Sequence, residues 1–102
     1  MRLQNELRVK LLQTFTELEP DDVTVAIMGE SGVDIKLSPA AKRVIPYSFE
    51  CKNQEKLSIW SALEQAENNT KEGTEPALVF KRNRSKTYVV VELDEFIKLI
   101  KE

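Results

Sequence analysis

Histidine is absent from this 102-residue sequence, and cysteine occurs once, as Cys51. The lack of histidine excludes Ser-His-Asp and Cys-His nucleophile systems, imidazole general bases and histidine-rich zinc sites. The single cysteine excludes an intramolecular disulfide and a multi-cysteine zinc site. Any hydrolytic chemistry in this chain therefore has to use carboxylates, lysine and a bound metal that prefers oxygen ligands.

Long hydrophobic runs are also lacking. The longest ones, at residues 23–28, 77–80 and 88–91, are far shorter than the roughly 18 to 20 residues of a membrane-spanning helix. The N-terminal residues contain no apolar segment followed by a small-residue cleavage site, which a secretory signal would require. We therefore expect a cytoplasmic protein without a membrane partner, and its length predicts one domain over residues 1–102.

The helices are predicted from apolar spacing and capping residues. Apolar residues at helical spacing predict helices at 3–14 and 57–69. Ser38, followed by proline, predicts the start of a short helical turn. Asp94 is expected to cap a last helix at 95–101.

The strands are predicted from β-branched and alternating segments, at 23–28, 33–37, 47–52, 77–80 and 87–93. The first two and the last two are spaced as hairpins. The resulting order, αβββαββα, mixes helices with strands. It predicts a single α/β domain with one central mixed β-sheet flanked by helices.

A cluster of charged residues is predicted on the central strands. Asp34 lies between two apolar residues of its strand, and Glu50 and Lys52 alternate with apolar residues, so that both leave the same face of the next strand. If the two strands are neighbours, two carboxylates meet and repel each other unless a cation is bound. Mg²⁺ fits such a site, and an adjacent lysine can orient or deprotonate a water that attacks a phosphodiester.

The residues Gly32-Val33-Asp34-Ile35, followed in the next strand by Glu50-Cys51-Lys52, resemble the motif of the PD-(D/E)XK nuclease superfamily. The resemblance is greatest to the small Holliday-junction-resolvase-like nucleases of archaea and bacteriophages, and it covers the chain from Glu6 to about Val91. It implies a restriction-endonuclease-like core. Val33 replaces the proline of the superfamily's name, a position that shapes the backbone and binds no metal.

The resemblance implies a role for each residue of the motif. Asp34, Glu50 and the main-chain carbonyl of Cys51 would bind Mg²⁺, with Mn²⁺ as a substitute, and Lys52 would act on the attacking water. No small-molecule cofactor is implied. The alternative interpretation of Glu50 and Lys52 is a surface ion pair worth under about 1 kcal/mol, and that of Cys51 is a small buried core residue.

Three further residues match the superfamily less specifically. Glu6, on the first helix, would bind a second metal or a water; alternatively it is a solvated residue that pairs with Lys10 one turn later. Ser31 and Gln65 would be supporting catalytic residues. Their alternative explanations are a turn residue and a polar residue on a helix surface.

These features predict a metal-dependent endodeoxyribonuclease that hydrolyses phosphodiester bonds in branched DNA. The alternatives are a flap, nick or single-strand nuclease of the same fold and a catalytically silent DNA-binding module. Because a four-way junction is two-fold symmetric and must be cut twice, we also expect a homodimer. Its candidate interfaces are the helix at 57–69 and the apolar residues Phe96, Ile97 and Ile100.

Contact with DNA requires a local basic patch, because the net charge is −2, with 15 Lys and Arg against 17 Asp and Glu. Residues 81–86 carry four cations and no acid, which is typical of a solvated turn but also suits phosphate contacts beside a nuclease site. The expected DNA-binding residues are Lys36, Lys81, Arg82, Arg84 and Lys86.

Overall fold

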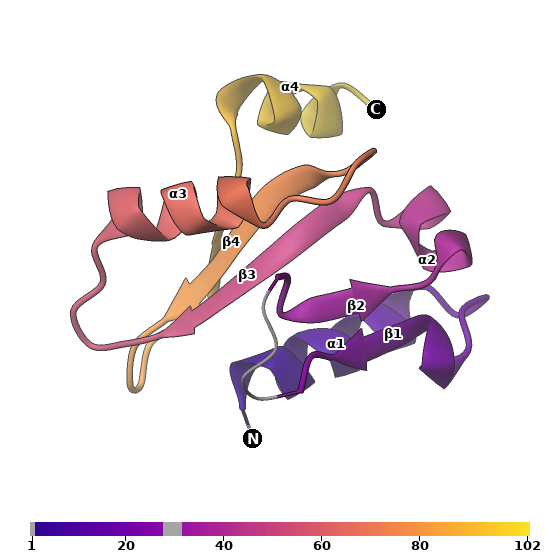
Figure 1. Ribbon diagram of the computed structural model, residues 1–102, viewed down its shortest axis with the longest axis horizontal. Helices are drawn as coiled ribbons and strands as arrows, with labels where there is room; N and C mark the ends of the chain where they lie inside the picture. The colour runs from indigo at the N-terminus through magenta and orange to yellow at the C-terminus, as the bar shows by residue number, and fades with distance from the viewer. Residues whose placement is uncertain (1, 28–31) are drawn as a thin grey trace.

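The structure is a computed structural model that describes residues 2–27 and 32–102 (Figure 1). Its helices and strands follow the predicted order. In chain order they are α1 (Leu3–Thr14), the 3₁₀ turn η1 (Pro20–Asp22), β1 (Val23–Val25), β2 (Ile35–Leu37), α2 (Pro39–Val44), β3 (Tyr47–Asn53), α3 (Ile59–Asn68), β4 (Glu75–Lys81), β5 (Tyr88–Val90) and α4 (Leu93–Lys101).

Local sequence explains where most of these elements begin. The helix predicted at 3–14 has the expected bounds, and Ser38 caps α2 by accepting a hydrogen bond from the Ala41 backbone N–H at 3.1 Å. The predicted cap of α4 is wrong. The helix begins at Leu93, so Asp94 lies inside its first turn and Glu92 is the capping residue. The Glu92 side chain accepts hydrogen bonds from the backbone N–H groups of Asp94 and Glu95 at 2.9 and 3.2 Å.

The α/β class and the mixed sheet are confirmed, but the strands form two sheets rather than one. β1 and β2 make an antiparallel pair, while β3 is parallel to β4 and β4 is antiparallel to β5. The two sheets approach each other just before β2, where the Asp34 N–H donates to the Phe49 carbonyl at 3.1 Å. This connection lies beside the predicted charged cluster.

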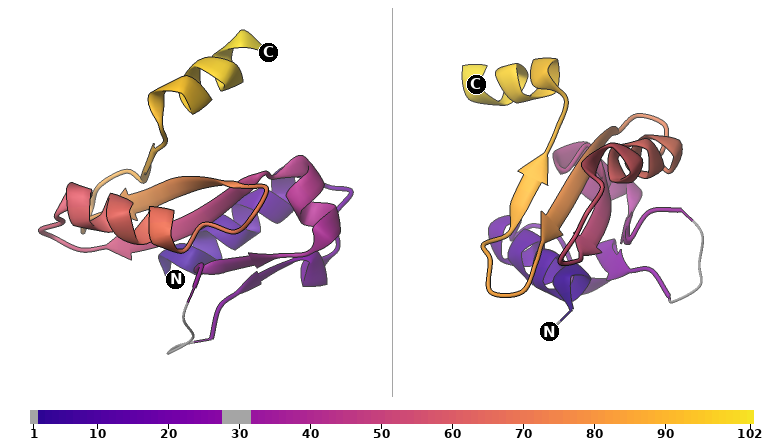
Figure 2. Two further views of the ribbon diagram at one scale, coloured as in Figure 1. Left: turned by 45° about the horizontal axis from the view of Figure 1, so that its top comes forward. Right: turned by 90° about the vertical axis from the view of Figure 1, so that its left-hand side faces the viewer.

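The three-stranded sheet lies between two helices. Figure 2 shows α1 on one side of the sheet and α3 on the other. Phe49, Cys51, Ala77 and Val79 belong to the main core, against which the apolar residues of α1 pack. Since neighbouring strand residues point to opposite faces, the fully buried Leu78 faces α3, whose buried residues are alanines.

The last helix, α4, stands apart from these layers in both figures. None of its residues is buried. It is linked to β3 through the Tyr47 hydroxyl, which donates to Glu95 at 3.4 Å. Across the described residues, every helix is too short or too polar to cross a lipid bilayer.

Candidate active site

Strand β3 presents its charged residues to the α3 side of the sheet. Its odd-numbered residues Phe49 and Cys51 belong to the core on the α1 side, so Glu50 and Lys52 leave the opposite face, as the alternation predicts. Glu50 is only 3% exposed. Its Oε2 lies 3.8 Å from the Lys52 Nζ, so the two residues form a largely buried ion pair.

Asp34 is fixed against the same strand by two hydrogen bonds. Its backbone N–H donates to the Phe49 carbonyl at 3.1 Å, and its Oδ2 accepts from the Cys51 backbone N–H at 2.6 Å. The residue therefore lies at a bend directly before β2, with its carboxylate bound to the edge of β3. The predicted meeting of Asp34 and Glu50 depends on this connection between the two sheets.

The carboxylates of Asp34 and Glu50 line one pocket of about 450 Å³, which lies between the residues just before β2 and α3. The predicted residue Gln65 also lines it. The full described lining is Gly32, Asp34, Glu50, Ser61, Glu64, Gln65, Asn68 and Asn69. The pocket is thus lined mainly by polar groups, which suits a site for ions and phosphates rather than for an apolar ligand.

The electrostatic environment of Glu50 favours a bound cation. Burial raises the pKa of the Glu50 carboxyl, and the negative charge of Asp34 raises it further. The Asn69 amide, which donates to Glu50 Oε1 at 3.3 Å, and the Lys52 ammonium act in the opposite direction without restoring the ordinary pKa. A cation between the carboxylates would stabilise both in their ionised forms.

The donor set fits a magnesium ion. Among the residues that the structure describes, no group of three or more Asp, Glu, His or Cys side chains could hold a metal. Mg²⁺ needs fewer protein ligands, since it is usually bound by one or two carboxylates, several waters and substrate phosphates. The Cys51 N–H and C=O point to the same edge of β3, so the carbonyl also lies on the Asp34 side.

The remaining predicted residues lie in different surroundings. The thiol of Cys51 is buried among apolar residues, and burial raises its pKa to about 12, which excludes a thiolate nucleophile near neutral pH. Glu6 does not line the described pocket; its Oε2 accepts a hydrogen bond from Thr87 at 3.3 Å. Ser31 lies outside the described residues.

A family model described as "Phage putative PDDEXK endonuclease" matches residues 25–102, which is most of the chain. The chain belongs to this family. The superfamily resemblance is therefore confirmed, while the closer likeness to Holliday-junction resolvases stays a prediction. No curated protein and no solved structure matches the chain.

The part of the chain that the family model matches contains Asp34, Glu50, Lys52 and Gln65. Helix α1, which carries Glu6, lies before it. The candidate site is therefore assembled from the bend before β2, from β3 and from α3, all within the matched residues.

Sequence reasoning missed several polar residues at the site of this PDDEXK chain. Asn69 binds Glu50 directly, and the other missed residues line the same pocket from one face of α3. A signal for them exists, because polar residues recur at helical spacing opposite the buried Ala62 and Ala66. This polar stripe consists of Ser61, Glu64, Gln65 and Asn68.

The predicted DNA-binding residues occupy two places in the structure. The tip between β4 and β5 is a tight turn in which Ser85 Oγ accepts from the Arg82 N–H at 3.0 Å and Arg84 adopts a positive φ of 63°. Arg82, Arg84 and Lys86 are exposed there. Lys36 lies instead on β2, where it lines a different pocket.

Proposed function

We propose that this protein is a Mg²⁺-dependent endodeoxyribonuclease that cuts branched DNA. The observation that carries the proposal is the pair of carboxylates, Asp34 and Glu50, at one polar pocket with Lys52 paired beside them. The family match supports a nuclease. The branched substrate is supported by the resemblance of the motif to resolvase-like nucleases.

Each residue of the pair has a defined role in the proposed reaction. Asp34 Oδ2 is engaged by the Cys51 N–H, which leaves Oδ1 for a metal, while buried Glu50 and the Cys51 carbonyl offer the other oxygens. Bound Mg²⁺ would supply Lewis acidity at the phosphate that is cut. Lys52 orients the attacking water or takes part in its deprotonation. Gln65, Glu6 and Ser31 remain proposed supporting residues.

The test uses labelled four-way junction, flap, nicked, single-stranded and linear duplex DNA, each with Mg²⁺ and with chelator. We expect cleavage only in the presence of Mg²⁺, and the four-way junction should be cut fastest. Faster cleavage of flap or nicked DNA would select the alternative nuclease. DNA binding without cleavage of any substrate would select the silent binding module.

In the proposed function, the basic turn between β4 and β5 contacts DNA. We expect Arg82→Ala with Arg84→Ala to weaken binding of all DNA sequences and to flatten the salt dependence by about one unit for each phosphate that is no longer neutralised. Folding should change little, because exposed charges in a turn contribute little stability. An unchanged salt slope, measured beside a Lys10→Ala control on α1, would place the DNA elsewhere.

The proposal also includes a homodimer through α4. Leu93, Phe96, Ile97 and Ile100 form one stripe on this helix and are between 48% and 68% exposed. The opposite side of the helix faces the body, where Glu95 binds Tyr47. A nine-residue helix is marginal in water by itself, so a partner for the stripe is expected to stabilise it.

A second copy suits this stripe because α4 is acidic in its first turn and basic in its last. In an antiparallel pair related by two-fold symmetry, the acidic turn of each helix would lie beside the basic turn of the other. Light scattering at micromolar concentration should give a dimer, and Phe96→Lys with Ile100→Lys should give a monomer. The comparison variant is Trp60→Lys, at an 83% exposed side chain of α3, the other candidate interface. It should stay dimeric, and a monomer here would move the interface from α4 to α3. A parent that is monomeric alone and on DNA would contradict the dimer and favour the flap or nick nuclease.

A further inference from the structure

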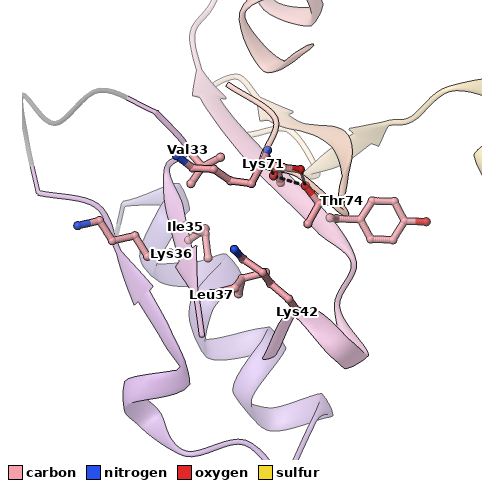
Figure 3. A pocket seen from close by; sticks show the side chains of 9 residues that line it. Val33, Ile35, Lys36, Leu37, Lys42, Lys71 and Thr74 are labelled. Atoms are coloured by element: carbon pink, nitrogen blue, oxygen red, sulfur yellow. Dashed lines mark hydrogen bonds between the residues drawn. The ribbon is translucent and has the colours of Figure 1, made fainter. Parts of the chain in front are cut away.

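A second pocket of about 260 Å³ lies beside the candidate active site (Figure 3). Its walls include the apolar residues Val33, Ile35 and Leu37, and its charged residues are Lys36, Lys42 and Lys71. Its described lining contains no aspartate or glutamate. The ammonium groups of Lys42 and Lys71 give this pocket a positive potential, in contrast to the neighbouring pocket with its two carboxylates.

Lys71 is held in place by the strand that carries Glu50. Its backbone N–H donates to Ser48 Oγ at 3.0 Å, and the Thr74 hydroxyl donates to the Lys71 carbonyl at 2.6 Å. The Ser48 and Thr74 hydroxyls are themselves 2.6 Å apart. Gly73, with a φ of +81°, completes this turn in a conformation that favours glycine. The backbone of Lys71 is thus fixed to β3 at Ser48, two residues before the proposed catalytic glutamate.

The ammonium group of Lys71 lies at the border between the two pockets. Its Nζ is 3.6 Å from the position that a Cβ would take at Gly32, and Gly32 lines the pocket of Asp34 and Glu50. Figure 3 shows the Lys71 side chain reaching toward Val33 and the Lys42 side chain rising beside Leu37, whereas Lys36 extends to the other side of β2. The ammonium groups of Lys42 and Lys71 therefore lie at the pocket, and neither forms an ion pair among residues 2–27 and 32–102.

We propose that Lys42 and Lys71 bind the sugar-phosphate backbone of the DNA strand immediately beside the phosphate that is cut. This inference rests on the proposed nuclease function. A strand with one phosphate at Asp34 and Glu50 carries further phosphates past the rim of that pocket, where the carboxylates alone would repel them. Lysine ammonium groups bind phosphate as point charges, and the apolar wall offers a surface for the deoxyribose ring.

The first experiment measures binding of a labelled four-way junction by fluorescence anisotropy, in chelator, over a range of salt concentrations. Lys42→Gln with Lys71→Gln is compared with the parent and with Lys10→Gln, an exposed lysine on α1. The pocket variant should bind about tenfold more weakly and show a salt slope that is shallower by about 0.9 for each phosphate that it no longer neutralises. The Lys10→Gln control should match the parent.

The second experiment locates the phosphate by cleavage in Mg²⁺ of junctions that carry one neutral methylphosphonate linkage each. A neutral linkage within about two nucleotides of the cut should lower the cleavage rate of the parent. The same linkage should lower the already reduced rate of the Lys42→Gln, Lys71→Gln variant only slightly. The inference is overturned if the parent cuts DNA but the pocket variant keeps the parental salt slope. It is also overturned if the effects of the lysine substitutions and of the neutral linkage are additive at every linkage. In both cases the proposed nuclease function is unaffected. If the parent neither binds nor cuts DNA, the nuclease proposal fails and takes the inference with it.

Discussion

Neighbouring residues on the two faces of β3 are buried to a similar extent, but their burial has opposite effects on the stability of the fold. Cys51, 8% exposed, faces α1 among apolar residues, while Glu50, 3% exposed, faces α3 and a polar pocket. On the first face burial removes apolar surface from water and stabilises the fold. On the second it disfavours the ionised form of a carboxylate and works against the fold. A buried charge maintained beside a second carboxylate is a mark of function rather than of stability.

The largest effect is expected when the charges on the α3 face of β3 are removed. Asp34→Asn or Glu50→Gln should abolish cleavage, because each removes a charged metal ligand. DNA binding should hold or tighten, and stability should hold or rise, because the repulsion between like charges is removed. Cleavage rates, anisotropy and thermal unfolding test this, with Glu67→Gln on α3 as a control outside the pocket. A neutral variant that cuts at the parental rate would defeat the metal assignment.

The second change on this face concerns Lys52. Lys52→Met should lose most of the cleavage activity while Mg²⁺ still binds, because the point charge at the water is removed and both carboxylates remain. Lys52→Arg should rescue poorly, since the guanidinium is larger and does not give up a proton. Single-turnover cleavage and calorimetric Mg²⁺ titration separate the two properties. Parental activity in Lys52→Met would reduce Lys52 to a structural counterion of Glu50.

The alternation within β3 was predictable from sequence because strand geometry fixes which residues share a face. The same holds for α1, in which Leu3, Leu7 and Leu11 recur every four residues, and for the Ser38 cap of α2. These features depend on neighbours in the chain. Their prediction needs no knowledge of the tertiary structure.

The division into two sheets was not predictable in this way. It depends on the chain before β2 meeting β3 where Asp34 binds Phe49 and Cys51, which is a property of the packed chain. Asn69 and Lys71 are likewise brought to the site by the turn after α3, far along the sequence from the motif. In α4 the apolar spacing indicates a helix correctly, but spacing alone does not say that the stripe faces away from the core.

On the α1 face, a change should affect stability and leave the chemistry alone. Cys51→Ala keeps the main-chain N–H that binds Asp34 and the main-chain carbonyl, but it removes the buried sulfur. We expect the free energy of unfolding to fall by about 1 kcal/mol and the cleavage rate at a temperature where the protein is folded to be unchanged. Denaturant unfolding and cleavage assays measure the two. Loss of cleavage in a folded Cys51→Ala protein would mean that both faces of β3 serve the reaction.

The smallest expected effect is the dependence of stability on pH that buried Glu50 causes in the absence of metal. Its pKa is raised above the ordinary value of 4.5, chiefly by burial and then by Asp34, so the folded state holds the proton more tightly than the unfolded state. The stabilising contribution of the protonated form is complete below the unfolded pKa and is lost as the pH rises through the folded pKa. Melting temperatures of the parent in chelator should therefore fall relative to those of Glu50→Gln as the pH rises above the ordinary value of 4.5. Mg²⁺ should reduce the difference at neutral pH, because it stabilises the ionised pair in the parent. If the melting temperatures of the two proteins change with pH in the same way, with and without Mg²⁺, the Glu50 carboxylate is solvated. The two faces of β3 would then differ in shape but not in the cost of burying a charge.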